Sequence, residues 1–558
     1  MRFLAGCALG ASLLALNPAP ISAHPGQSAI QTPTLADHKQ PLIPTSAEET
    51  RGVRERFRQA LAYSYMPSRS GHLFVLPRKY FPVMFESGNY AHDGHSFIKG
   101  QKVPHEGATH GMIWDYDTHI PLLLYGPGLI KTSQRLSTPA TQQDLVPTYA
   151  RLMGAVPPQG AVHGRVLTEA LRPDPVKPKA ILTIVIDQGG WQYYQAHPDK
   201  TPYTRALMQR GSLYTEARIK HVDVETFVGH AAIGTGAYPY QHGIISNRFY
   251  NQAFGARISP LSPDTSGIFL NSPSLADVWG QQTANQAHVI SYAYADRAAI
   301  GMAGHGAMYA RRDKKDIVLW YSNRSGQLET NEKYYRLPDY LRGMHIKPYL
   351  QQLLAQDPQG KWFGHGVNNL RDVNRTPAQA AFDGDVLMKL LAREPIGQDD
   401  ITDLVYVTLK ASDACGHSFG FESDECGSVF AMQDQQIRRI VEAFEKKVGQ
   451  DQMLVVLTAD HGASPLTTLS GGSGISAEVL KAAMNKAFDK LDNDVELVYD
   501  MLASQIFVDE NEMQRNGVSW EQLKAFLRDY QVDGHQAFLD VYSRRDVTQF
   551  QLEQNLIP

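Results

Sequence analysis

The chain has 558 residues, of which 43% are hydrophobic, and this excludes a largely disordered protein. The length allows one large α/β domain with insertions or two domains. A formal net charge of −4 argues against a surface for nucleic-acid duplexes or for anionic membranes, because both partners favour basic proteins.

The N-terminus has the features of a secretory signal. Arg2 precedes an apolar run that is too short to span a membrane, and the small residue Ala23 provides a cleavage site. We therefore expect a signal peptide over residues 1–23 and a periplasmic or secreted protein. Residues 24–49 are rich in Pro and polar residues and are predicted to be a disordered leader. We find no transmembrane segment in the sequence.

The first motif of metal-ligand type is Thr109-His110-Gly111, which precedes a strand-like run ending at Tyr125. A histidine in such a place is often structural, and His119 is the nearest alternative to His110. A Pro-rich linker at residues 173–180 separates this segment, residues 50–172, from the main part, residues 181–558.

The run from Ala180 to Ile186 predicts a buried strand that ends at Asp187. Its carboxylate either caps the next helix or lies at the carboxyl edge of a sheet, where open α/β sheets place their chemistry. Three other histidines are interpreted as packing or supporting residues rather than ligands: His230, His242 and His305.

Residues 260–400 fit the alternation of strands and helices less well, and we expect them to form an inserted cap over the site. Aromatic residues in this segment either hold part of a substrate or form the core of the cap. They include Tyr292, Trp320, Tyr321, Tyr334 and Tyr335.

Two more strand-like runs are followed by ligand-type residues. After Leu409 comes Asp413-Ala414-Cys415-Gly416-His417, whose spacing puts a carboxylate and an imidazole on one helical face. After Leu457 comes Thr458-Ala459-Asp460-His461-Gly462, an Asp-His pair at the end of a buried strand. Together with Asp187 and His110, these motifs provide three Asp and three His. Such ligands suit two zinc ions, although Mn or Fe bind the same atoms.

Strand-like runs alternate with helical patterns at Met432–Lys447 and Ala477–Leu491. This alternation predicts an α/β fold with a doubly wound, mostly parallel sheet and helices on both faces. Cys415 and Cys426 lie in a segment that we interpret as a polar loop, and they are either a disulfide or two free thiols.

The segment after Asp187 carries a family resemblance. It contains Thr226-Phe227-Val228-Gly229-His230, then Thr235-Gly236, Pro239, His242-Gly243-Ile244 and Asn247. The chain resembles the alkaline phosphatase superfamily, in the branch of type I phosphodiesterases, nucleotide pyrophosphatases and phosphate-irrepressible bacterial alkaline phosphatases. The resemblance covers residues 50–558 and implies the alkaline-phosphatase-like α/β fold.

The resemblance also implies a two-zinc site with a covalent mechanism. One zinc would be held by Asp187, Asp460, His461 and the oxygen of Thr226. The other would be held by Asp413, His417 and His110. Thr226 would be the nucleophile, and Asn247 and Arg297 would contact phosphoryl oxygens. A threonine hydroxyl is a poor nucleophile at neutral pH, and zinc coordination lowers its pKa.

Two features depart from the family. Its monoesterase members have a lysine two residues before the arginine, and this position is Ala295 here. A lysine neutralises the extra negative oxygen of a monoester, so its loss favours diester or broad phosphate-ester hydrolysis. The order of segments also differs, because the histidine segment that closes the family's domain comes first here. A circular permutation explains this order, and the joining of fragments is the alternative.

We therefore expect an exported, zinc-dependent hydrolase of small phosphate monoesters, diesters or both. The alternatives are a sulfatase or phosphonate hydrolase on the same fold and a catalytically inactive metal-binding relative. A sulfatase nucleophile needs Cys or Ser in a C/S-x-P-x-R context, which the segment around Thr226 lacks. The complete ligand set argues against the inactive relative. The sequence leaves the oligomeric state open.

Overall fold

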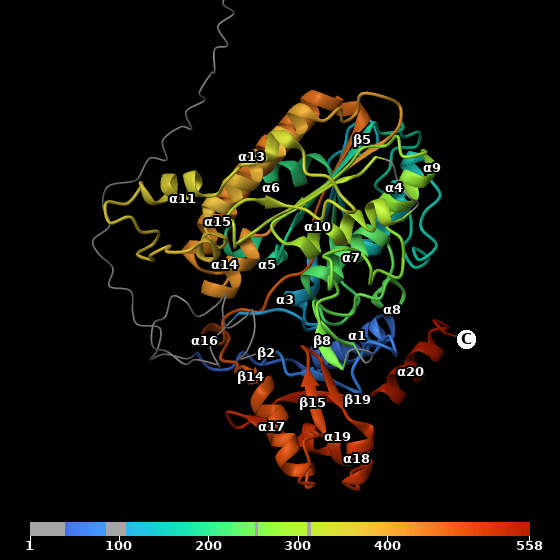
Figure 1. The fold of residues 1–558 in the computed structure, drawn as a ribbon, viewed down its shortest axis with the longest axis vertical. Helices are drawn as coiled ribbons and strands as arrows, with labels where there is room; N and C mark the ends of the chain where they lie inside the picture. Colours follow the sequence, from blue (N-terminus) through green and yellow to red (C-terminus); the bar gives the residue numbers. More distant parts are fainter. Residues whose placement is uncertain (1–39, 85–107, 252–254, 310–313, 558) are drawn as a thin grey trace, which may run out of the picture. The chain divides into compact units, whose positions relative to one another are not determined.

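A nine-stranded mixed sheet forms the centre of the protein (Figure 1). The computed structural model describes residues 40–84, 108–251, 255–309 and 314–557. The predicted signal peptide and residues 24–39 of the predicted leader lie outside this part. In spatial order the strands are β11 (Leu328–Glu329), β10 (Ile317–Tyr321), β9 (Val289–Ala293), β12 (Asp403–Leu409), β5 (Ala180–Ile186), β13 (Met453–Ala459), β3 (His119–Tyr125), β6 (Ser212–Arg218) and β4 (Gln134–Leu136).

The middle of this sheet is parallel. β10, β9, β12, β5 and β13 pair in parallel, whereas β3 is antiparallel to both β13 and β6. The three central strands are buried over their whole length, which explains their nearly continuous apolar sequences. The predicted mostly parallel α/β sheet is confirmed.

Alternate residues of β5 enter two separate cores. Leu182 and Ile184 pack with the helices of one face, whereas Ile181 and Val185 pack with those of the other. Figure 1 shows helices on both faces of the sheet. The first face is covered by α6 (Pro202–Arg210), α13 (Pro377–Arg393) and α15 (Asp424–Val448). The second is covered by α4 (Leu145–Met153), α7 (Thr226–Thr235), α9 (Leu275–Gln282) and α10 (Asp296–Ala303).

A smaller antiparallel sheet combines segments from distant parts of the chain. Its order is β15 (Val498–Met501), β16 (Gln505–Val508), β1 (Leu73–Pro77) and β19 (Phe538–Ser543). Helices complete its core, and they include α1 (Ala47–Ser64), α17 (Ala477–Phe488) and α19 (Trp520–Asp529). The C-terminal helix α20 (Arg544–Glu553) lies on α1, where Gln551 donates hydrogen bonds to the carbonyls of Ala62 and Tyr65.

The prediction of an inserted cap at residues 260–400 is wrong for β9, β10 and β11, which belong to the central sheet. The alternation is hidden there because α10 has only eight residues and is buried from Ala298 to Ala303, so it is too short to give a clear helical pattern. The aromatic residues of this segment are core residues. Tyr292 and Tyr321 lie in one core, and Trp320, Tyr334 and Tyr335 lie in another.

Two smaller differences concern the leader and the cysteines. α1 begins at Ala47, inside the predicted leader, because Ser46 caps its first turn. Cys415 and Cys426 are buried free thiols rather than a disulfide. They lie on two helices, α14 (Ala411–Phe419) and α15, rather than in a polar loop. Among the helices of the described residues, none has both the length and the apolar character needed to span a lipid bilayer.

Candidate active site

The site lies where the three central parallel strands end. Ile186, the last residue of β5, pairs with Leu409 of β12 and with Ala459 of β13. The next residue of each strand is therefore brought to the same edge of the sheet. These residues are Asp187, Lys410 and Asp460, and all three are buried. An open parallel sheet places its ligands at this edge.

Asp187, Asp460 and His461 form the first of two groups of candidate metal ligands, which we name the first and second ligand groups. The His461 Nε2 lies 3.5 Å from Asp187 Oδ1 and 3.4 Å from Asp460 Oδ2. All three atoms are buried and have no hydrogen-bond partner. The other oxygen of Asp460 accepts hydrogen bonds from the backbone N–H groups of Gln188 and His461, so only Oδ2 faces the group.

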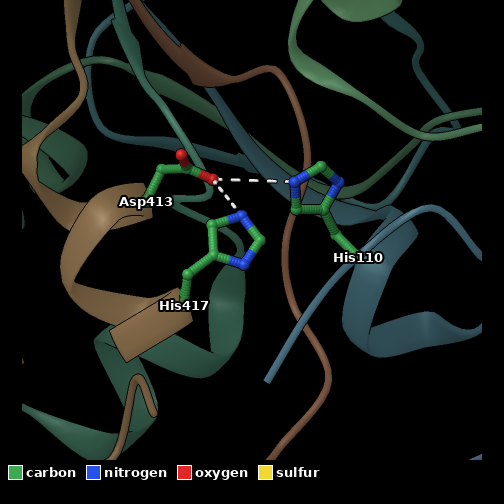
Figure 2. A group of neighbouring side chains, drawn as sticks. All are labelled: His110, Asp413 and His417. Atoms are coloured by element: carbon green, nitrogen blue, oxygen red, sulfur yellow. Dashed lines mark ion pairs between the residues drawn. The ribbon is translucent and has the colours of Figure 1, made fainter. Parts of the chain in front are cut away.

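His110, Asp413 and His417 form the second ligand group (Figure 2). Asp413 Oδ1 lies 3.2 Å from Nε2 of His417, one turn further along α14, and 3.6 Å from Nε2 of His110. His110 comes from the segment before β3, far away in the sequence. Its ring also stacks on that of His461, with centroids 3.7 Å apart, so the two ligand groups are neighbours.

The three imidazoles share one orientation. The Nδ1 atoms of His110, His417 and His461 lie within hydrogen-bond distance of backbone carbonyls, those of Val224, Ala108 and Gly462 respectively. A carbonyl can only accept, so each Nδ1 carries a proton and each Nε2 is the atom that faces the carboxylates. Histidine metal ligands have this arrangement, with Nδ1 bound to a backbone carbonyl and Nε2 turned toward the ion.

The donor set therefore fits divalent cations. Burial lowers the pKa of His461 to about 3, which keeps its imidazole neutral and able to ligate. Burial raises the pKa of Asp187 to about 6, while the charge of Lys410 opposes this shift. Burial also raises the pKa of Asp460 well above its usual value. Carboxylate oxygens and imidazole nitrogens of this kind suit zinc, and an ion would offset the cost of burying these groups.

Thr226 is the first residue of α7 and is 1% exposed. Asn247 lies against this helix end, where its Oδ1 accepts a hydrogen bond from the N–H of Phe227 at 2.9 Å. The amide nitrogen of Asn247 therefore remains as the donor for a ligand. Glu225 accepts hydrogen bonds from the backbone N–H of Asn247 and from Ser246, and burial raises its pKa to about 7.

Arg297 lies in the first turn of α10, and its charge acts on Asp187, Glu225 and Lys410. The guanidinium of Arg297 therefore lies within electrostatic range of the first ligand group. Ala295, two residues earlier, is buried in an apolar cluster around α10 and contributes no charge.

The other histidines that the sequence offered as candidates either lie outside the two ligand groups or form hydrogen bonds through both ring nitrogens. His119 bonds to the carbonyl of Thr215 at the start of β3. His242 accepts from the N–H of Ile244, and His305 pairs with Asp277. His230 lies beside Asp460, but its two ring nitrogens bond to Thr226 O at 2.6 Å and to Thr408 Oγ1 at 2.8 Å. It therefore supports the helix of Thr226.

Sequence reasoning missed two residues of the site, Gln188 and Lys410. Gln188 has a positive φ of 63°, and its side-chain amide donates to Asp413 Oδ1 at 3.0 Å. Lys410 is 4% exposed in its side chain and contacts Asp187, Asp413 and Thr226. Their positions in the sequence could have indicated them, because each lies within two residues of the end of a buried strand, as Asp460 does.

Comparison with known proteins agrees with this geometry. Residues 181–550 match the model of the family described as type I phosphodiesterase / nucleotide pyrophosphatase. The chain belongs to this family. The family assignment confirms the resemblance to this branch of the alkaline phosphatase superfamily that the motif around Thr226 indicated.

Curated relatives include two bacterial alkaline phosphatases. Alkaline phosphatase PafA of Elizabethkingia meningoseptica is 26% identical over 337 residues, which are 52% of this chain and 60% of PafA. Alkaline phosphatase PhoD of Zymomonas mobilis is 27% identical over 317 residues, which are 51% of this chain and 53% of PhoD. The matched region thus spans less than two thirds of either relative.

The crystal structure of wild-type PafA matches this structure with a TM-score of 0.54 and 21% identity. The match covers 63% of this chain and 76% of the PafA chain. At this identity the likeness shows a shared alkaline-phosphatase-like fold, and the chemistry has to be argued from the site.

Proposed function

We propose that this protein hydrolyses phosphate esters through a covalent intermediate on Thr226, at a site that holds two zinc ions. The observation that carries the proposal is the shared orientation of His110, His417 and His461. Their Nε2 atoms converge with three carboxylates beside a buried threonine at a helix N-terminus. Membership of the phosphodiesterase family supports the same chemistry.

The first ligand group would hold one metal together with Thr226 Oγ1, and the second ligand group would hold the other. When bound, the metals would lower the pKa of the threonine hydroxyl and of water and would offset charge on the phosphoryl group. Mn or Fe would fit the same donor atoms, so the metal content of the purified protein has to be measured.

The reaction would proceed in two displacements at phosphorus. The Thr226 hydroxyl loses its proton as Oγ1 attacks phosphorus, the bond to the ester oxygen breaks, and the leaving alcohol takes up a proton. Water then loses a proton as it attacks the phosphothreonine, the bond from phosphorus to Oγ1 breaks, and Oγ1 takes up a proton again. Throughout, the side-chain amide of Asn247 and the guanidinium of Arg297 would donate hydrogen bonds to the non-bridging phosphoryl oxygens.

The test compares Thr226→Ala and Thr226→Ser with the zinc-loaded wild type. Thr226→Ala should lose turnover of para-nitrophenyl phosphate and of its bis ester by at least about 1,000-fold, while metal content stays the same. Thr226→Ser keeps a hydroxyl and should retain measurable turnover. Acid quenching followed by mass spectrometry should find the phosphoryl group on Thr226. Unchanged turnover in Thr226→Ala would reject the covalent mechanism.

Two further proposals concern export and chain order. The charged and apolar N-terminal pattern within residues 1–23 supports export to the periplasm or medium, which fractionation of producing cells would test. A circular permutation is supported by the proximity of His110 to Asp413 and by the contact of α20 with α1. A chain rearranged to begin at residue 181 and to end with residues 50–172 should fold and turn over substrate. An unfolded product would count against the permutation.

A further inference from the structure

Lys410 is a fixed positive charge at the centre of the site. It follows β12 directly, as Asp187 follows β5, and the pairing of Leu409 with Ile186 puts the two side by side. Its Nζ lies 2.8 Å from Asp187 Oδ2, 2.5 Å from Asp413 Oδ2 and 3.2 Å from Thr226 Oγ1. An ammonium has three donors, and of these three contacts the one with Thr226 Oγ1 is the longest, so it is the one that a phosphoryl oxygen can replace.

This ammonium leaves the metal-facing atoms in place. Lys410 donates hydrogen bonds to the Oδ2 atoms of Asp187 and Asp413. The histidines face the opposite atoms, with His461 next to Asp187 Oδ1, and His110 and His417 next to Asp413 Oδ1. The same carboxylates can therefore hold the ammonium and two metal ions at once. Lys410 is an addition to the metal site rather than a substitute for one of its ions.

The charge of the loaded site depends on this residue. Asp187, Asp413 and Asp460 bring three negative charges, and two divalent ions with Lys410 and Arg297 would bring six positive ones. Lys410 makes this balance more positive by one charge. A monoester dianion carries one more negative charge than a diester monoanion, so the added charge favours the monoester. In a buried site such an imbalance is costly, because charges interact strongly at low dielectric.

We propose that Lys410 is a specificity-determining residue that makes this site selective for dianionic phosphate monoesters. It lies at hydrogen-bond distance from the nucleophile, so it is also close to a phosphoryl group that Thr226 attacks. From β12 it supplies the positive charge that the buried Ala295 on α10 cannot supply. The proposal rests on the phosphohydrolase function proposed above and goes beyond it by naming the substrate class.

The experiment compares Lys410→Met with Lys524→Met. Lys524 is a matched control, because it is also largely buried and ion-paired, with Asp546 at 3.2 Å, but lies on α19 in the smaller sheet layer. Both variants and the wild type are loaded with zinc. Metal content, kcat/KM for para-nitrophenyl phosphate and for its bis ester, and calorimetric affinity for inorganic phosphate and dimethyl phosphate are then measured.

Lys410→Met should keep both metals but lose about 10- to 100-fold in affinity for inorganic phosphate and in kcat/KM for the monoester, the size expected for one hydrogen bond from a charged group. The diester should lose less than about threefold, and Lys524→Met should match the wild type. Equal losses for both esters, or the loss of a metal, would overturn the proposal, because Lys410 would then only hold the ligands or the nucleophile in place.

Binding measurements on the wild type test the proposal even if the variant does not fold or the enzyme shows no turnover. If Lys410→Met does not fold, the wild type is still tested, because it must bind inorganic phosphate at least about tenfold more tightly than dimethyl phosphate. Equal affinities would overturn the proposal. If the wild type turns over neither ester, the proposed phosphohydrolase function fails, whereas the binding measurements still decide whether Lys410 selects a dianion.

Discussion

Gly229 allows α7 to approach the strand end that carries Asp460. A Cβ at this position would lie 2.7 Å from the carbonyl oxygen of Asp460 and 3.0 Å from its Cβ, whereas ordinary contacts begin at 3.4 Å. Gly229→Ala therefore has to move the helix away from the strand by about 0.7 Å. Thr226 lies one turn before Gly229, so the proposed nucleophile moves relative to the first ligand group.

The expected effect is mainly catalytic. A misplacement of about 1 Å costs on the order of 100-fold in rate, so kcat/KM for a phosphate ester should fall by about 30- to 100-fold. Overpacking of this kind also lowers the free energy of unfolding by about 1–3 kcal/mol. Both are measured on zinc-loaded protein, by steady-state hydrolysis and by urea unfolding.

Gly52→Ala is the control, because Gly52 is also helical but a Cβ there would meet only the flexible end of Arg56, at 3.4 Å. This variant should keep wild-type activity and gain up to about 1 kcal/mol in stability. Wild-type activity in folded Gly229→Ala would refute the reasoning, since the close approach would then not position Thr226.

Three further predictions concern the metals and a buried carboxyl. Removal of metal by a chelator should lower the unfolding temperature, and zinc should restore it, because ions bind only the folded ligand groups. Gln188→Ala loses the hydrogen bond to Asp413 and should weaken metal binding by about 10- to 100-fold in chelator competition. Asp383, which accepts from Tyr292, has a pKa raised to about 7 by burial. This folded pKa lies above the unfolded value of 3.8, so the proton on Asp383 stabilises the fold at low pH, and this stabilisation is lost as pH rises from about 4 to 7. Over that range the free energy of unfolding of Asp383→Asn should rise relative to that of the wild type by up to roughly 4 kcal/mol.

Each of these has a result that would contradict it. An unfolding temperature that is the same with and without metal would mean that the ligand groups bind no ion. Unchanged metal affinity in Gln188→Ala would mean that Asp413 needs no support from this amide. Gln192→Ala, which removes a hydrogen bond to the carbonyl of Ala463, is the control. A difference in unfolding free energy between Asp383→Asn and the wild type that does not change with pH would show that Asp383 titrates normally in the folded protein.

The sequence by itself determined the fold class and the types of residue in the site. β5, β12 and β13 could be predicted because strands buried on both faces are nearly continuous apolar runs. The ligand candidates could be predicted because Asp and His next to the ends of such runs are costly unless they serve a site. The residues around Thr226 were enough to identify the family. β9 and β10 were missed because the helix between them, α10, has only eight residues and is buried over its last six.

Only the tertiary structure decided which atoms meet. The pairing of Ile186 with Leu409 and Ala459 sets Asp187 between Lys410 and Asp460, and no local pattern encodes the register of strands so far apart in sequence. The backbone carbonyls that orient His110, His417 and His461 are likewise fixed by packing. Lys410 shows the difference most clearly. In the sequence it is one lysine after a strand, whereas in the fold its ammonium joins two carboxylates to Thr226, because burial leaves it no water to solvate its charge.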